Sequence, residues 1–480
     1  MPAPAFALRG QCYFHHERVG VEQRISVSNH RRVGANFRIE PVSQTARVVR
    51  TASVTRVLTG LWIAALVPAL ACSDDPVEPG PADPVVPEPA DPSPPDSIVI
   101  PPRSVSAEAA VLEKSNAFAW KLLPAAMAAD PEANVLVSPL SASMALGMAL
   151  NGARGTTYDQ MQATHGFEDA PLDTVNLGYH GLMTHLPAAD STVSTQLANS
   201  AWYRDGFAVE QSFMEAVRAF FDAEIAGLDF SSATAADTIN QWVSEKTGGR
   251  IEEIVESPID DRTMLFLINA IYFKGPWKYA FDPQRTQDAP FHIADGQSQS
   301  MPMMELTAEF PYVEDGNLQV VELPFGEGAF AMTVLVPGAG SSIDAELASM
   351  DVRRWRSLLD KLNARRVRVV LPRFRVEYDE SLKPVLQALG TTDAFLPNVA
   401  DFTGISAASP PLYISEVKQK TFVEVAEEGA EGAGTTSVGI GVTSLPPSVI
   451  ANRPFVYLIR ERESGAILFA GVLRRPPDTG

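Results

Sequence analysis

Cysteine is nearly absent from this 480-residue sequence and occurs only as Cys12 and Cys72. Two cysteines exclude a disulfide-stapled scaffold and a zinc site built from cysteine ligands. Basic residues are also scarce. The sequence contains 38 Lys and Arg against 58 Asp and Glu, which gives a formal net charge of −20. A nucleic-acid partner requires clustered positive charge, so this composition argues against one.

Recognisable catalytic and metal-binding motifs are missing as well. The sequence contains only seven histidines, and none of them lies in the HExxH spacing that holds zinc. The GxSxG turn that presents a nucleophilic serine in many hydrolases does not occur either. We therefore expect no metal, no cofactor and no enzymatic activity.

The N-terminal part of the chain has the features of a targeting segment. Residues 1–71 contain nine arginines and three acidic residues, and they end in an apolar run from Val57 to Ala71. This run is short for a membrane-spanning helix, which needs about 20 residues, but it suits the core of a signal peptide. The run leads into Cys72 and resembles a bacterial lipobox, in which the cysteine is lipidated. We expect either lipidation at Cys72 or an ordinary cleaved signal.

A tether follows the leader at residues 72–104. The stretch 73–97 holds nine prolines, seven acidic residues and no basic residue. Proline fixes the backbone and the like charges repel each other, so this stretch should be extended. The predicted bacterial protein is exported, either as a cell-envelope lipoprotein or to the extracellular space. Because the leader is unusually long, we also expect translation to start near residue 48, so that 1–47 is not translated.

From residue 105 to residue 476 we predict one α+β domain. Ser138 and Pro139 suit the cap and first turn of a helix. The helical patterns lie at Ala107–Leu123, Ser141–Leu150, Thr157–Thr164 and Ala233–Thr247. The later apolar run Met264–Tyr272 is typical of a strand that is covered on both faces. Further strands are predicted at Val320–Leu323, Phe330–Val336, Arg366–Leu371, Phe455–Ile459 and Ala466–Val472.

The segment between Glu427 and Pro447 is rich in small and acidic residues. Composition alone is typical of a flexible surface loop. However, the even-numbered positions from Ala430 to Val442 are all small or apolar, and a period of two is the period of a β-strand. The pattern therefore favours a loop that can become a strand, with its even face inward.

Several motifs resemble the serpin family, in the family's order and across the whole body of the chain. They are Asn134–Ser141 with Gly152, Ala153 and Thr156; Ile239–Val243; Thr247–Ile251; Asn269–Trp277 with Phe281, Thr286 and Phe291; Leu371–Phe374; Ala400–Ser406; Arg453–Phe455; and Gly465–Gly471. The resemblance implies a serpin fold, which is a single large domain with about nine helices, three β-sheets and an exposed reactive loop, here at 427–447.

In serpins the exposed loop is bait for a serine or cysteine protease. Cleavage lets the loop insert into the main sheet while the protease stays bound as an acyl-enzyme. The resemblance places the reactive bond at Thr443–Ser444, with Val442–Thr443 and Ser444–Leu445 as alternatives. The bait residues are small and neutral, so we predict an elastase-like or subtilisin-like target rather than a trypsin-like one. The implied hinge comprises Glu427, Glu428, Gly429, Ala430, Glu431, Gly432, Ala433 and Gly434.

The resemblance also implies a polar cluster beneath the sheet that opens during insertion. Its positions match Ser138, Ser141, Asn269 and Gln419. Serpins usually carry histidine at the last of these, and glutamine hydrogen-bonds but does not titrate near neutral pH. The implied function is irreversible inhibition by a monomer that forms a covalent acyl complex with its target. The alternative is a non-inhibitory serpin that acts as a surface binding module.

Overall fold

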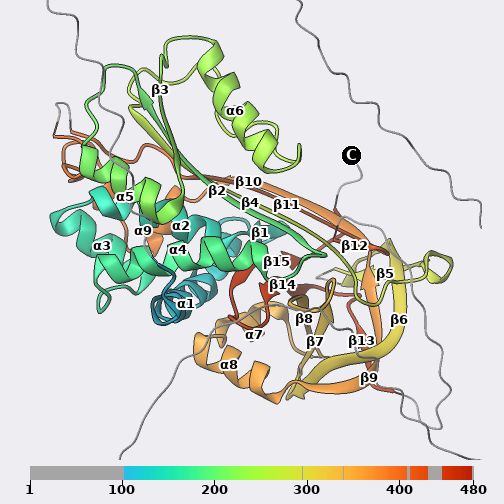
Figure 1. Cartoon of the computed structure of the whole chain (residues 1–480). Helices are drawn as coiled ribbons and strands as arrows, with labels where there is room; N and C mark the ends of the chain where they lie inside the picture. Colours follow the sequence, from blue (N-terminus) through green and yellow to red (C-terminus); the bar gives the residue numbers. More distant parts are fainter. Residues whose placement is uncertain (1–101, 294–295, 339, 408–410, 431–445, 478–480) are drawn as a thin grey trace, which may run out of the picture. The chain divides into compact units, whose positions relative to one another are not determined.

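The computed structural model describes residues 102–293, 296–338, 340–407, 411–430 and 446–477. Nine α-helices lie within these residues (Figure 1). The four helices expected from the sequence are confirmed as α1, α2, α3 and α6. The helices are α1 (Val105–Ala129), α2 (Pro139–Gly152), α3 (Gly155–His165), α4 (Leu172–Ala188), α5 (Gln211–Phe221), α6 (Thr234–Lys246), α7 (Ile343–Ala348), α8 (Val352–Lys361) and α9 (Lys383–Ala388).

The strands that matter most for function form a six-stranded sheet. In spatial order they are β10 (Phe374–Ser381), β11 (Lys418–Ala426), β12 (Gly429–Ala430), β4 (Leu265–Pro276), β2 (Ser194–Arg204) and β3 (Glu224–Leu228). Helix α6 lies on one face of this sheet, and α2, α4 and α5 lie on the other (Figure 1). The short strand β12 lies between β11 and β4 in the strand order and pairs with both of them. Residues far apart in the sequence therefore become neighbours in this sheet.

The remaining strands form a second, nine-stranded sheet. They are β1 (Val135–Val137), β15 (Ile467–Leu473), β14 (Phe455–Glu461), β8 (Phe330–Pro337), β7 (Leu318–Pro324), β6 (Ser298–Asp315), β9 (Asn363–Pro372), β13 (Ser448–Ile450) and β5 (Gln287–His292). All six strands that the sequence predicted are confirmed, as β4, β7, β8, β9, β14 and β15.

The expectation of three sheets needs a correction, because the described strands join into two hydrogen-bonded sheets. The reason is the length of β6, which spans 18 residues. One end of β6 pairs with β5, its middle pairs with β9, and its other end pairs with β7. Because β6 pairs with β5, β9 and β7 in turn, it joins strands that would otherwise form two separate sheets into one.

Strand β4 is covered on both faces, as its continuous apolar sequence predicted. On one face, Ile268 and Ala270 pack in a cluster with α6 that includes Trp202 and Trp242. On the other face, Ile271 and Phe273 belong to the main hydrophobic core. No helix in the described part of the chain is long and apolar enough to cross a membrane. The apolar run 57–71 and Cys72 lie outside the described residues.

A buried histidine in the core should make stability depend on pH. His165 ends α3 and stacks between Phe118 and Phe167, with ring centroids 4.9 and 5.7 Å away. Burial lowers the pKa of its imidazole from 6.5 to about 4, although Nδ1 lies 2.7 Å from the Met161 carbonyl. Between these two pH values His165 binds a proton in the unfolded chain but stays neutral in the folded chain. The free energy of unfolding therefore decreases as pH falls.

We expect the free energy of unfolding to decrease by up to about 3 kcal/mol between pH 6.5 and pH 4 on account of this one group. Urea unfolding followed by tryptophan fluorescence at pH 7 and pH 4.5 measures the loss. His165→Gln, which does not titrate, should remove that part of the pH dependence. An equally steep pH dependence in the variant would show that other groups are responsible.

Candidate functional site

Gln419 and Ser138 are joined at the centre of the six-stranded sheet. Ser138 caps α2, and its Oγ accepts the Ser141 N–H at 3.3 Å while donating to the Leu468 carbonyl at 2.6 Å. Gln419 on β11 donates from Nε2 to the Ser138 carbonyl and accepts the Ser138 N–H at Oε1, both at 2.9 Å. The amide thus uses both of its hydrogen-bonding functions on one backbone residue, which holds β11 to the start of α2.

Asn269 extends this polar cluster to β4. Ser141 Oγ donates to the Asn269 carbonyl at 3.3 Å, so all four residues that the resemblance singled out are brought together. The Asn269 side chain donates to Asn199 Oδ1 at 2.7 Å, and Asn199 donates to the Phe221 carbonyl at 2.7 Å. Asn269 Oδ1 is buried and has no hydrogen-bond partner among the described residues. It is therefore available to a polar group arriving between β4 and β11.

Asn199 is a member of this network that sequence reasoning missed. It lies on β2 directly opposite Asn269 on β4 and is 1% exposed. Its segment carries no motif that distinguishes it from an ordinary strand. Only the pairing register, which depends on the whole sheet, places the two asparagines side by side.

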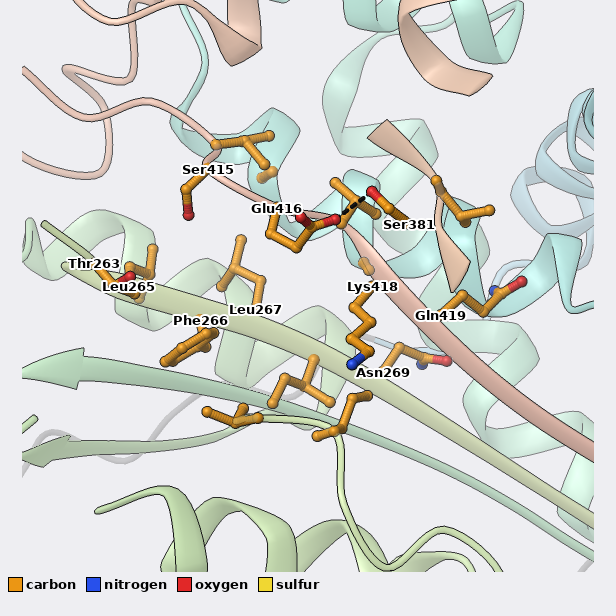
Figure 2. A pocket seen from close by; sticks show the side chains of 18 of the residues that line it. Thr263, Leu265, Phe266, Leu267, Asn269, Ser381, Ser415, Glu416, Lys418 and Gln419 are labelled. Carbon is orange, nitrogen blue, oxygen red and sulfur yellow. Dashed lines mark hydrogen bonds between the residues drawn. The ribbon is translucent and has the colours of Figure 1, made fainter. Parts of the chain in front are cut away.

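A cavity of about 950 Å³ separates β4 from β11 beside this cluster. Leu265, Leu267 and Asn269 line it from β4, and Gln419 lines it from β11 (Figure 2). Its floor includes apolar side chains of α2, among them Leu146. Within the described residues, β12 is the only strand between β4 and β11, and it fills only the end of the gap near Pro276. The sheet is therefore built with space for further strand.

The two residues of β12 belong to the predicted hinge and already lie inside the sheet. Gly429 pairs with Ala426 and Pro276, and Ala430 pairs with Val425 and Gly275. Gly429 has φ of +150°, and a Cβ there would lie 2.3 Å from the Gly275 carbonyl oxygen. Only glycine fits this position. Ala430 is 3% exposed, so the first even-numbered residue of the loop points inward.

The residues before β12 are fixed by several hydrogen bonds. The backbone carbonyls of Glu427 and Glu428 accept the N–H groups of Phe281 and Trp277, both at 2.9 Å. The Glu427 carboxylate accepts from Thr286 Oγ1 at 2.8 Å and lies 3.7 Å from Arg373 Nη1. Trp277 Nε1 donates to the Ala426 carbonyl at 2.8 Å. The start of the loop is therefore held firmly at one end of the gap.

Several predicted site residues fall outside the described residues. These are the rest of the hinge, Glu431, Gly432, Ala433 and Gly434; the reactive bond, Thr443 and Ser444; and the lipidation site, Cys72. The chain is described again from residue 446, and β13 then pairs with β9 in parallel.

Comparisons with known proteins identify the fold and the class of protein. A family model described as serpin (serine protease inhibitor) matches residues 113–476. Iripin-2 from Ixodes ricinus is 35% identical over 379 residues, which cover 77% of this chain and 94% of that protein. The leukocyte elastase inhibitor of Bos taurus is 35% identical over 361 residues, which cover 72% of this chain and 94% of that protein.

Solved structures agree with these sequence matches. The thermophilic serpin Tengpin in its native state is similar with a TM-score of 0.70 and 29% identity, over 76% of this chain and 94% of that one. The chain belongs to the serpin family. Its family and its relatives named as inhibitors support protease inhibition as the class of function.

Proposed function

We propose that this serpin is an irreversible suicide-substrate inhibitor of serine proteases. The observation that carries the proposal is the gap between β4 and β11, with residues 429–430 already paired at its end. A loop that starts in register between two strands needs only to be released at its far end in order to continue. Cleavage would release it, and insertion would exchange exposed backbone for hydrogen bonds to both strands.

Continuing the pairing of β12 predicts which residues would meet. Ala430 pairs with Gly275 on β4 and Val425 on β11. In the same register, Thr436 would arrive between Asn269 and Gln419. Its hydroxyl could then donate to Asn269 Oδ1, which is buried without a partner among the described residues. The polar cluster would thus receive the one polar residue of the loop's even face.

The apolar even-numbered residues of the loop would pack against the apolar side chains that line the cavity. In the continued register, Val438 would lie beside Leu267 and Ile440 beside Leu265, and both leucines line the cavity. Each buried aliphatic side chain would contribute about 1.5–3 kcal/mol. The sequence of the loop and the lining of the gap therefore match in polarity along their length.

The proposed chemistry takes place at Thr443–Ser444. The protease serine would attack the Thr443 carbonyl, the bond to the Ser444 nitrogen would break, and that nitrogen would take a proton from the protease histidine. Thr443 would then be held as an ester on the protease while the loop inserts. A target with a small apolar pocket fits Thr443, and one 35% identical relative is named as an elastase inhibitor.

Incubation with a panel of serine proteases tests the proposal. An elastase-like or subtilisin-like protease should give a complex that survives denaturing electrophoresis, together with the released peptide Ser444–Gly480. Mass spectrometry of that peptide fixes the bond, and a start at Thr443 or Leu445 would shift it by one residue. Cleavage of the loop without any stable complex would favour the alternative, a non-inhibitory serpin that serves as a binding module.

The bait residue should control which protease is captured. No basic residue lies between Lys420 and Thr443, so trypsin should form no complex at the reactive bond. Thr443→Arg should create preference for trypsin, because the acidic first pocket of trypsin-like enzymes binds arginine. We expect a gain in the trypsin inhibition rate on the order of 100-fold or more. Thr443→Val is the matched control, and equal trypsin capture by both variants would argue against this bond.

We also propose that the protein is exported and held to a bacterial envelope through lipid on Cys72. The apolar run, the cysteine that follows it and the proline-rich acidic tether support this. Metabolic labelling with a fatty acid should label the wild type and not Cys72→Ser. Release of unlabelled wild-type protein into the medium would favour an ordinary cleaved signal. Peptide mapping that recovers residues 1–40 would contradict a translation start near residue 48.

A further inference from the structure

Two arginines and one glutamate form a triad on the outer face of the nine-stranded sheet. Arg285 Nη2 donates to Glu305 Oε1 at 2.6 Å, and Arg368 Nη2 donates to Glu305 Oε2. The three side chains come from different parts of the chain. Arg285 ends the short 3₁₀ helix Pro283–Arg285, Glu305 lies on β6 and Arg368 lies on β9. A single carboxylate thus holds two guanidinium groups side by side.

The triad lies between the two ends of the reactive loop. At the start of the loop, the neighbour of Arg285, Thr286, donates to the Glu427 carboxylate at 2.8 Å. At the end of the loop, the Arg368 backbone N–H donates to the Pro447 carbonyl at 2.9 Å. Strands β5, β6, β9 and β13 gather at the same end of the domain as β12 (Figure 1). A protease that binds the loop must therefore approach this surface.

The length of chain after the reactive bond places the triad within reach of a bound protease. In the proposed function this bond joins Thr443 to Ser444, and the three residues of chain from Ser444 to Pro447 span at most about 11 Å. A standard protease–inhibitor interface covers about 800 Å² on each partner, which corresponds to a disc of about 16 Å radius. A disc of that size centred on the reactive bond extends past Pro447 to its neighbour Arg368.

The triad has one positive charge in excess and hydrogen-bond donors to spare. The hydrogen bond from Arg368 and the charges of both arginines hold the pKa of Glu305 below its usual range, so Glu305 is ionised. A guanidinium has five N–H groups, and among the described residues each of these two donates one side-chain hydrogen bond, to Glu305. The Arg285 and Arg368 side chains are 50% and 37% exposed, so they can donate to an incoming carboxylate.

An exposed apolar side chain lies on the same face of the sheet. Ile450 on β13 pairs with Val370 on β9, and Val370 pairs with Glu305 on β6, so these three side chains point to one face. Ile450 is 36% exposed. Arginine is enriched at protein–protein interfaces, where it accompanies apolar contacts. We call Arg285, Glu305, Arg368 and Ile450 together the loop-base patch.

We propose that the loop-base patch is a second contact surface for the target protease and binds acidic side chains that flank the protease's active site. The inference rests on the proposed function and names the kind of protease that is captured, which is one with a carboxylate on the side that binds residues after the reactive bond. The protein carries a net charge of −20, so a locally positive patch beside the loop would attract an acidic surface to that place and orient the approaching protease.

Association rates of the full chain with the protease that the wild type captures fastest in the panel test this inference. The variants are Arg285→Gln, Arg368→Gln and the double variant. At about 20 mM salt the double variant should associate about tenfold more slowly than the wild type. At about 0.5 M salt the difference should shrink to about twofold or less, because salt screens the attraction.

Arg353→Gln is the matched control for these variants. Arg353 is also an exposed arginine paired with one carboxylate, that of Asp351, and it lies on α8, away from β12 and β13 (Figure 1). It should associate at the wild-type rate at both salt concentrations. Melting temperatures close to that of the wild type show that each variant is folded.

Glu305→Gln separates a contact surface from a mere brace for the loop. This variant adds a positive charge to the patch and frees guanidinium donors, so a contact surface should associate about threefold faster at low salt. A brace would be broken in the same way by Glu305→Gln as by the arginine variants, and all of them would associate more slowly at every salt concentration.

Each outcome decides a different part of the argument. Equal rates and equal salt dependence in the wild type and the double arginine variant would overturn the contact surface and leave inhibition by loop insertion in place. Slower association of Glu305→Gln would also overturn it, in favour of a brace. A wild type that captures none of the proteases would overturn the proposed function, and this inference with it.

Discussion

Replacing Ala430 with arginine should abolish protease inhibition while leaving cleavage of the loop intact. Ala430 is 3% exposed and pairs with Val425 and Gly275 inside the sheet. An arginine there would place an unpaired charge among apolar side chains, which costs several kcal/mol. The hinge would instead leave the sheet, and a loop that does not insert releases the protease. Inhibition should fall at least about 100-fold, with cleaved inhibitor as the product.

Glu431→Arg is the matched control for this variant. Residue 431 follows Ala430 and in an inserted strand would alternate to the outward face, so an arginine there should leave inhibition nearly unchanged. Because Ala430 is already buried in the native sheet, Ala430→Arg should also lower the melting temperature. Val438→Arg separates the two effects, since it lies beyond the paired hinge and should block insertion only. Full inhibition by Ala430→Arg and Val438→Arg would contradict the insertion mechanism.

Cleavage of Thr443–Ser444 should raise the melting temperature by about 10 °C or more. In the proposed mechanism the cut would free the loop to occupy the cavity of about 950 Å³ between β4 and β11. Val438, Ile440 and Val442 would each add about 1.5–3 kcal/mol of burial. New hydrogen bonds to both neighbouring strands would add further stabilisation of about 1 kcal/mol each before the ordering of the backbone is subtracted.

Differential scanning calorimetry of the native and the cleaved protein measures this increase. The cleaved form is prepared with a protease that cuts the loop without forming a complex. Cleaved Val438→Arg is the control, because it carries the same nick and should show little increase. Equal melting temperatures for the native and cleaved wild type would favour a binding module over an inhibitor.

Local sequence features predicted four of the nine helices and six of the fifteen strands among the described residues. The continuous apolar run in β4 predicted a strand covered on both faces, and α6 and the main core do cover it. Ser138 and Pro139 marked the start of α2, where Ser138 caps the helix. The number of sheets was wrong, because a local pattern does not show that β6 pairs with three different strands along its length.

The candidate site was only partly accessible to the sequence. Ordered motifs drew attention to Ser138, Ser141, Asn269 and Gln419, and the structure brings these four together. Asn199 was not singled out as a site residue. It bonds to Asn269, which lies 70 residues away in the sequence, so its place in the network depends on strand register.

The sequence by itself predicted that the loop could become a strand, because a period of two with small or apolar even positions is a property of the chain alone. Only the tertiary structure decided that a place for this strand exists. The gap requires β4 and β11 to run side by side without filling the space between them, and it requires the hinge to start in register at Gly429 and Ala430. These are relations between segments about 150 residues apart, and burial and hydrogen bonding fix them only when the whole sheet is assembled.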